Sequence, residues 1–202
     1  VQAFPSLANM QISLEEKLRL FTQRLPLLSM LNVKYIISAY ELPPTPGLAI
    51  VAAVDSTRFH IPIYLYENAR FLPRVYLAPA VRFLSTTDEA QSFTAVTDSK
   101  NDLTKVSLIE CPGCTDQGRA SPKDTLTIRD YRDGYLNVFT DTAFSRWLVF
   151  SESNLPGWRA MVDGEQVAIT TANYLFQGIF LPPGEHHVEL EYIGIFSLKK
   201  PR

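Results

Sequence analysis

The chain has 202 residues, of which 46% are hydrophobic and 20% charged, and its formal net charge is −2. This length is enough to bury a core in one large or two small domains. The scattered basic residues and near-neutral charge exclude the basic footprint of a nucleic-acid-binding protein, so no nucleic acid is expected as a partner.

The first half of the chain predicts a mixture of helices and strands. Ser13 and Glu16 have the spacing of a capping box, and the apolar residues that recur through Leu25 predict one helical face. Pro26 ends this helix or begins a short second one. Strands are predicted over 33–39, 48–54, 61–66, 75–77 and 105–109, with a turn near 55–60 and a capped helix over 87–93.

The second half predicts short strands separated by turns. Residues 111–123 are rich in Gly, Pro, Ser and Asp, and we interpret them as the main internal boundary. Asp133-Gly134 and Asp163-Gly164 are two-residue hairpin signals, and Pro183-Gly184 turns the chain into its last strand. The expected strands cover 126–128, 136–138, 147–150, 158–162, 167–169, 175–181 and 188–192.

These patterns predict a mainly β fold with minor α. Seven short strands at this turn spacing favour an antiparallel β-sandwich, of the jelly-roll or immunoglobulin-like kind. The predicted domains are an α+β portion with an N-terminal helix at 1–110, a boundary at 111–123, a sandwich at 124–196 and a tail at 197–202. The longest apolar run, over 48–54, is far shorter than the ~20 residues of a membrane-spanning helix.

Cys111 and Cys114 have the spacing of a redox dithiol or of half a zinc knuckle. A small loop disulfide and two free thiols are the competing interpretations. His60, His186 and His187 supply no second paired spacing, so we expect no metal site.

The aromatic residues suggest a sugar-stacking platform, although the alternation around Trp158 also fits a core position. The platform would comprise Trp147, Trp158, Tyr174, Phe176 and Tyr192. The candidate ligand-binding residues are Trp158, Arg159, Asp163, Asn173 and Tyr174.

No catalytic residue is predicted. Glu189 and Glu191 stand about 7 Å apart on one strand face, which is typical of any half-exposed strand. The sequence contains no nucleophile elbow, glycine-rich phosphate loop or His-Glu metal motif, so we expect no cofactor.

Four segments, in order along the chain, resemble the C-terminal part of the YfhO-like bacterial multi-spanning membrane proteins. They are 30–38 (MLNVKYIIS), 66–76 (YENARFLPRVY), 155–164 (LPGWRAMVDG) and 180–192 (FLPPGEHHVELEY). The glycines and Trp158 within them also have structural explanations as turn and core residues.

This resemblance implies a domain on the extracytoplasmic face of the bacterial membrane, within a glycosyltransferase-like protein that uses polyprenyl-phosphate sugars. Its partners would be the remainder of the parent protein and a glycan or lipid-linked sugar. The family's catalytic acidic residue is expected on a loop outside this sequence. Since Val1 is not an initiator methionine, we expect a piece of a longer protein. The basic end at 199–202 instead favours the cytoplasmic side.

Three hypotheses follow. The leading one is a non-catalytic extracytoplasmic domain that contacts the glycan acceptor. The second is a stand-alone carbohydrate- or protein-binding β-sandwich module. The third is an enzyme in its own right, either a hydrolase or a dithiol oxidoreductase.

Overall fold

The computed structural model describes residues 13–56, 61–85, 88–98 and 100–194. The chain divides into two compact units: the smaller contains Val1–Leu72 and Thr97–Thr104, and the larger contains Pro73–Val96 and Lys105–Arg202. The predicted turn near 55–60 lies partly outside the described residues, and His60, Thr87 and the basic tail at 197–202 lie wholly outside them.

The smaller unit begins with two helices, α1 (Leu14–Thr22) and α2 (Leu25–Met30). The Ser13 side chain caps α1 by accepting a hydrogen bond from the Glu16 backbone N–H at 3.2 Å. Pro26 stands in the first turn of α2, where its missing N–H costs no helical hydrogen bond. Both predicted helix starts are therefore confirmed.

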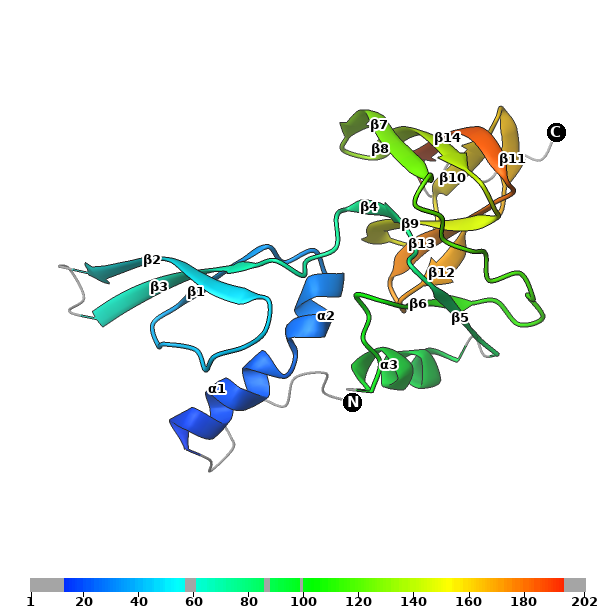
Figure 1. The fold of residues 1–202 in the computed structure, drawn as a ribbon. Helices are drawn as coiled ribbons and strands as arrows, with labels where there is room; N and C mark the ends of the chain where they lie inside the picture. Colours follow the sequence, from blue (N-terminus) through cyan, green and yellow to red (C-terminus); the bar gives the residue numbers. More distant parts are fainter. Residues whose placement is uncertain (1–12, 57–60, 86–87, 99, 195–202) are drawn as a thin grey trace. The chain divides into compact units, whose positions relative to one another are not determined.

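A three-stranded antiparallel sheet completes this unit. Its order is β1 (Tyr35–Ser38), β3 (Ile61–Asn68), β2 (Leu48–Ser56). The two helices lie on one side of it (Figure 1). The buried core between helices and sheet contains Leu25, Ile36, Leu42 and Tyr66, with Leu18, Phe21, Leu28, Val33, Leu48 and Tyr64 packed around it.

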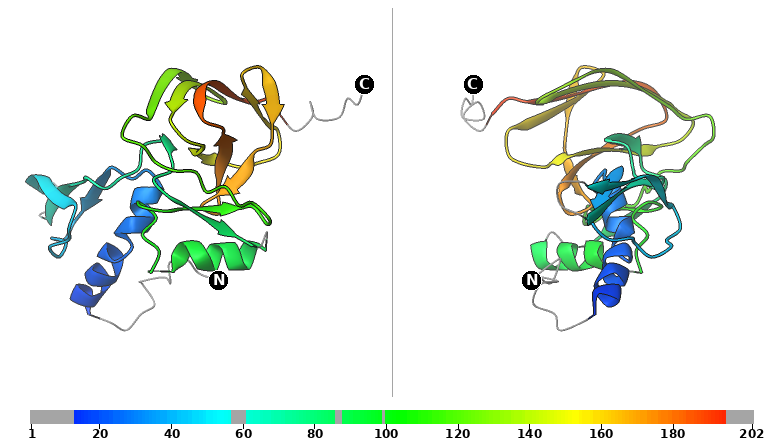
Figure 2. Two further views of the ribbon diagram at one scale, coloured as in Figure 1. Left: turned by 45° about the vertical axis from the view of Figure 1, so that its right-hand side comes forward. Right: turned by 90° about the vertical axis from the view of Figure 1, so that its left-hand side faces the viewer.

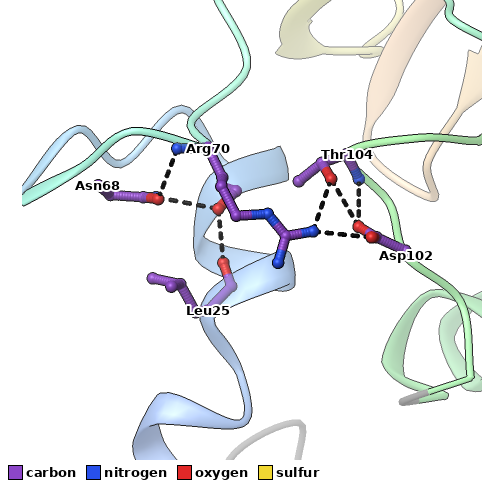
Figure 3. Close-up of polar contacts among 6 residues, drawn as sticks. Leu25, Asn68, Arg70, Asp102 and Thr104 are labelled. Carbon is purple, nitrogen blue, oxygen red and sulfur yellow. Dashed lines mark hydrogen bonds and ion pairs between the residues drawn. The ribbon is translucent and has the colours of Figure 1, made fainter. Parts of the chain in front are cut away.

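Polar contacts bind distant segments of the smaller unit together (Figure 3). The buried Asn68 side chain donates to Ser29 Oγ on α2 at 2.9 Å. Arg70 Nη2 donates to Asp102 Oδ2 at 2.7 Å and to Thr104 Oγ1 at 3.1 Å. These two bonds fasten the segment Thr97–Thr104 to the end of β3.

The larger unit contains two sheets among its described residues (Figure 1). The five-stranded sheet has the order β11 (Glu165–Val167), β10 (Trp158–Val162), β14 (Gly184–Tyr192), β8 (Tyr135–Thr142), β7 (Thr125–Arg132). The six-stranded sheet has the order β4 (Val75–Leu77), β9 (Arg146–Ser153), β13 (Phe176–Leu181), β12 (Thr170–Ala172), β6 (Ser107–Glu110), β5 (Val81–Leu84). Every pair is antiparallel except β5 with β6.

The two sheets bury one core between them, which confirms the predicted β-sandwich (Figure 2). Along β14, Val188 and Leu190 are fully buried while Glu189 and Glu191 are partly exposed, as the alternation predicts. The shared core consists of Val75, Leu136, Val138, Leu148, Phe150, Ala160, Val162, Ile179, Leu181, Val188 and Leu190.

The sandwich also uses strands that precede residue 111. β4 pairs with β9, and β6 pairs with β12, while β5, which no sequence pattern indicated, pairs with β6. The segment 111–123 has no helix or strand and joins β6 to β7 inside the larger unit. The strand expected over 167–169 is instead two short strands, β11 and β12, which belong to different sheets.

The expected helix over 87–93 is α3 (Glu89–Thr97). It is capped by Asp88, whose Oδ1 accepts from the Gln91 backbone N–H at 2.9 Å. Its Phe93 packs edge-on against Tyr174, with 5.5 Å between ring centroids. The helix is therefore attached to the turn between β12 and β13.

Candidate functional site

Three segments meet at one end of the sandwich: the β7–β8 hairpin turn, the connection from β9 to β10, and the end of β14. The carbonyl of Gly134 accepts from the Tyr192 N–H, and that of Gly157 accepts from the Ile193 N–H, both at 2.8 Å. Gly134 has φ +71°, which suits glycine, and a Cβ there would contact Tyr192 Cβ at 3.4 Å. Glycine is therefore favoured here by the positive φ of the turn, since a Cβ would make only an ordinary contact with Tyr192.

These segments enclose an open cavity of about 450 Å³, which we call the aromatic cleft. Its size is within the range of small-ligand sites. It is lined by Arg74, Tyr131, Arg132, Asp133, Gly134, Phe150, Glu152, Ser153, Leu155, Trp158 and Tyr192.

Aromatic rings dominate the floor of the aromatic cleft. Trp158 and Tyr192 are directly opposite on β10 and β14, with ring centroids 5.6 Å apart. Trp158 also packs edge-on against the buried Phe150 at 5.8 Å, and Phe150 does the same against Tyr131 at 6.1 Å. Tyr131 and Tyr192 remain 48% and 41% exposed. Trp158 thus packs against the core and also lines the cleft.

One ion pair lies beside these rings. Arg74 Nη2 is 2.8 Å from Glu152 Oε2, and both side chains are partly exposed. The Arg74 guanidinium also lies 5.9 Å from the centre of the Tyr131 ring. The backbone of Arg74 is held to β9, because the Arg74 carbonyl accepts from the Ser151 N–H at 2.8 Å. The cleft therefore combines aromatic rings with a paired donor and acceptor.

A second groove of about 510 Å³ adjoins the first at Leu155 and Trp158, which line both. Arg159, Gln166 and Ile169 also line it. Arg159 forms an exposed ion pair with Glu191, at 2.7 Å. Of the five residues predicted to bind a ligand, Trp158 therefore lies in the aromatic cleft and Arg159 in its neighbour.

Asp163 lies at the opposite end of β10 and lines neither groove. Its carboxylate is 2.7 Å from His186 Nδ1 and accepts from the His187 backbone N–H at 2.8 Å. The His186 bond, followed by the His187 bond, lowers the pKa of Asp163 below its usual value. The side chain supports the β10–β11 turn, where Asp163 has φ +53°.

Asn173 and Tyr174 occupy the β12–β13 turn, away from both grooves. Asn173 is fully buried and bridges two partners: its Oδ1 accepts from the Leu108 N–H at 2.8 Å, and its Nδ2 donates to the Tyr76 hydroxyl at 3.1 Å. Burial raises the pKa of Tyr76 to about 12. The Tyr174 hydroxyl donates to Glu89 Oε1 at 2.8 Å.

Trp147 and the two cysteines do not line the aromatic cleft. Trp147 is buried, and its indole N–H donates to the Asp116 carbonyl at 3.1 Å. Cys111 and Cys114 form a disulfide in the segment that joins β6 to β7. Within the described residues, no group of three or more His, Cys, Asp or Glu side chains is placed to hold a metal ion.

Sequence reasoning missed Arg74, Tyr131 and Glu152. Tyr131 carried a usable signal, since it is an aromatic residue two positions before the Asp133-Gly134 turn. Arg74 carried none, because β4 reaches the cleft only by pairing with β9, far along the chain.

Residues 85–197, more than half of the chain, match the family model of the bacterial membrane protein YfhO. The chain belongs to the YfhO family of bacterial membrane proteins. The match includes the five-stranded sheet and most of the aromatic cleft, whereas Arg74 precedes it. Neither the curated proteins nor the solved structures contain a significant match. None of the helices in the described ranges has the length and hydropathy needed to cross a membrane.

Proposed function

We propose that this YfhO-family chain is a non-catalytic extracytoplasmic domain of a glycosyltransferase-like membrane protein, and that its aromatic cleft binds a glycan. The observation that carries the proposal is the presence of Tyr131, Trp158 and Tyr192 around one open cavity. Sugar rings present C–H faces that pack on aromatic rings, and such rings contribute large contact areas at low conformational cost.

The polar groups of the cleft suit a hydroxyl-rich ligand. The paired Arg74 and Glu152 offer donors and an acceptor beside the rings. The indole N–H of Trp158 has no hydrogen-bond partner among the residues that the structure describes, so it remains available as a further donor. Apolar surface combined with convergent polar groups is the usual means of orienting a small ligand.

The carboxylates on β14 support a binding role over a catalytic one. Glu189 accepts a hydrogen bond from the Tyr135 hydroxyl at 2.7 Å, and Glu191 is paired with Arg159. Both are thus engaged by neighbours on the outer surface of the sheet. We therefore assign the chemistry of the parent protein to another part of it.

The Cys111–Cys114 disulfide supports the extracytoplasmic placement, because disulfides persist in oxidising compartments. Alkylation of cells with a maleimide polymer before and after reduction tests this placement. We expect the two cysteines of the family protein to react only after reduction. Because the polymer does not cross the membrane, no reaction in intact cells even after reduction, with reaction once the cells are lysed, would place the domain in the cytoplasm.

Glycan binding is tested by titrating the chain with soluble tetrasaccharides of glucose, galactose, mannose and N-acetylglucosamine, followed by tryptophan fluorescence and saturation-transfer NMR. We expect at least one to bind, and Tyr131→Ala to weaken it at least about fivefold, as expected for the loss of ~1 kcal/mol of ring contact. Phe144→Ala, at a residue 40% exposed outside the cleft, is the matched control. If none of the tetrasaccharides binds, or if both variants weaken binding equally, the cleft is not a glycan-binding site.

A further inference from the structure

The three-stranded sheet of the smaller unit is apolar on both of its faces. Side chains alternate between the faces along each strand. Ile36, Tyr64 and Tyr66 point to the face that α1 and α2 cover. We call the opposite side the outer face. It carries Tyr35, Ile37, Val54, Ile61, Ile63 and Leu65.

The strand register makes the outer face continuous. Leu65 on β3 lies between Ile37 on β1 and Ala52 on β2, and the next pair along is Ile63 with Val54. Ile37 is 75% exposed and Val54 60% exposed. In an antiparallel sheet with one face on a core, the other face is normally polar. A contiguous exposed apolar surface of this kind marks an interaction site.

Among the described residues of the outer face, the charged groups lie at one end. Glu67 lies opposite Tyr35 and is paired with Lys34, whose Nζ is 3.6 Å from Glu67 Oε1. The same Lys34 Nζ lies 5.1 Å from the centre of the Tyr35 ring. The outer face therefore runs from an apolar end, at Ile61 and Val54, to an end with a tyrosine and a lysine.

The area of the outer face distinguishes between two occupants. Three strands ~4.8 Å apart and about six residues long cover roughly 300 Å². A stable dimer buries about 800 Å² on each partner, so a second copy of this sheet face would be too small a contact. A bilayer needs no minimum area when the protein is already membrane-bound, because tethering supplies a high local concentration. The YfhO family is a family of membrane proteins.

The charged end also matches a bilayer. Tyrosine is enriched at the level of the lipid head groups, and lysine extends its ammonium group toward water from an apolar stem. We propose that the outer face of the β1–β3–β2 sheet lies on the lipid bilayer, with its apolar side chains at the head-group boundary and Tyr35 and Lys34 among the head groups. This inference is independent of glycan binding.

A fluorescent probe at the outer face tests the proposal. The full 202-residue chain, with its disulfide intact, would carry an NBD label on Ile37→Cys or, as control, on Ile128→Cys, a residue 47% exposed on β7 of the larger unit. Vesicles of phosphatidylethanolamine and phosphatidylglycerol are then added. We expect a blue shift, and quenching by spin-labelled lipid, for the label at 37 and neither effect at 128. No shift at 37, or equal shifts at both positions, would overturn the proposal.

Charge substitution gives a second readout. Ile37→Glu and Val54→Glu should lower the vesicle-bound fraction at least about tenfold, while Ile128→Glu should leave it unchanged. Circular dichroism checks that each variant is folded. Sedimentation without lipid tests whether a second copy of the chain occupies the outer face. If the unchanged chain forms dimers and Ile37→Glu abolishes them, the outer face is a dimer interface and the proposal of bilayer contact is refuted.

Discussion

The two units differ in how their sheets are covered. In the larger unit, two sheets face each other and bury Leu136, Leu148, Leu181 and Leu190 completely. In the smaller unit, a single sheet is covered on one side by two short helices, and its outer face is exposed. The larger unit therefore completes its own core, whereas the smaller unit presents an apolar surface that a partner would cover.

This difference separates two kinds of functional surface. The sandwich is a rigid support for loops, and its aromatic cleft lies where those loops meet. The smaller unit presents the face of a regular sheet instead. The unfolding of the two units can be followed by different signals. Tryptophan fluorescence reports on the larger unit, which contains both tryptophans of the chain, Trp147 and Trp158. The helical circular dichroism signal reports mainly on the smaller unit, because α1 and α2 supply most of the described helix.

The largest effect is expected from a cavity in the sandwich core. Leu148→Ala should lower the free energy of unfolding of the larger unit by about 2–5 kcal/mol, because Leu148 is fully buried between the sheets. Urea unfolding followed by tryptophan fluorescence should show the shift, and the helical signal should shift less, because only α3 among the helices belongs mainly to the larger unit. Leu25→Ala, in the core of the smaller unit, should produce the reverse pattern. One transition shared by both signals would show that the units unfold together.

Two glycines in the segment 111–123 give a smaller effect and a matched control. Gly118 has φ +70°, and a Cβ there would lie 2.5 Å from the Ser145 carbonyl oxygen. Gly113 has φ +87° but nothing within 4 Å of a Cβ. We expect Gly113→Ala to cost about 1 kcal/mol of backbone strain, and Gly118→Ala to cost more than ~2 kcal/mol because backbone must also move. Equal shifts of the fluorescence transition would contradict the close approach of this segment to β9.

In the smaller unit, Arg70→Met should remove one attachment of the segment Thr97–Thr104, leaving the bond from Arg24 to the Thr97 carbonyl, while keeping the aliphatic stem beside Gly47. The ion pair with Asp102 is about one-third exposed, so we expect a loss of about 1 kcal/mol from the helical transition. The fluorescence transition should not move. Arg19→Met breaks a more exposed pair within α1 and should cost clearly less. An equal loss for both arginines would mean that the attachment does not stabilise the unit.

Local patterns in the sequence predicted the local structure well. Ser13 and Pro26 mark two helix starts, and Asp133-Gly134 and Asp163-Gly164 mark hairpin turns, because each acts on the backbone within a few residues. The alternation along 188–192 likewise predicted which side of β14 is buried. These signals depend on neighbours within a few residues, so they can be interpreted without knowing the fold.

Long-range pairing was the part that the sequence could not predict. Nothing near Val81 indicates a strand that pairs with β6, and nothing near Arg74 indicates a partner on β9. The same limit affected the candidate site. Trp158 stood out by residue type, but Asn173 and Tyr174, two turn residues with positive φ, lie in a different turn from the cleft. Tyr131, Trp158 and Tyr192 line one cavity, and only the structure shows that these three residues lie together.

The smallest expected effect concerns pH and the β10–β11 turn. Since the folded-state pKa of Asp163 is lowered by its bonds from His186 and His187, its contribution to stability is present above the unfolded carboxyl pKa of about 3.9 and is lost as the pH falls through the folded value. The side chain is half exposed, so this contribution should stay below ~1 kcal/mol. Asp163→Asn should therefore destabilise the larger unit at about pH 7, and the difference from the unchanged chain should shrink as the pH approaches about 3.

Glu165→Gln is the control for this prediction, because Glu165 is an exposed carboxylate of the same hairpin for which no hydrogen bond is found within the described ranges. Fluorescence-monitored urea unfolding at several pH values gives both comparisons. A difference between Asp163→Asn and the unchanged chain that is constant across this pH range could not arise from the ionised carboxylate. It would instead mean that the substitution disturbs the hydrogen bonds of this side chain independently of its charge, because asparagine tolerates φ +53° as well as aspartate does.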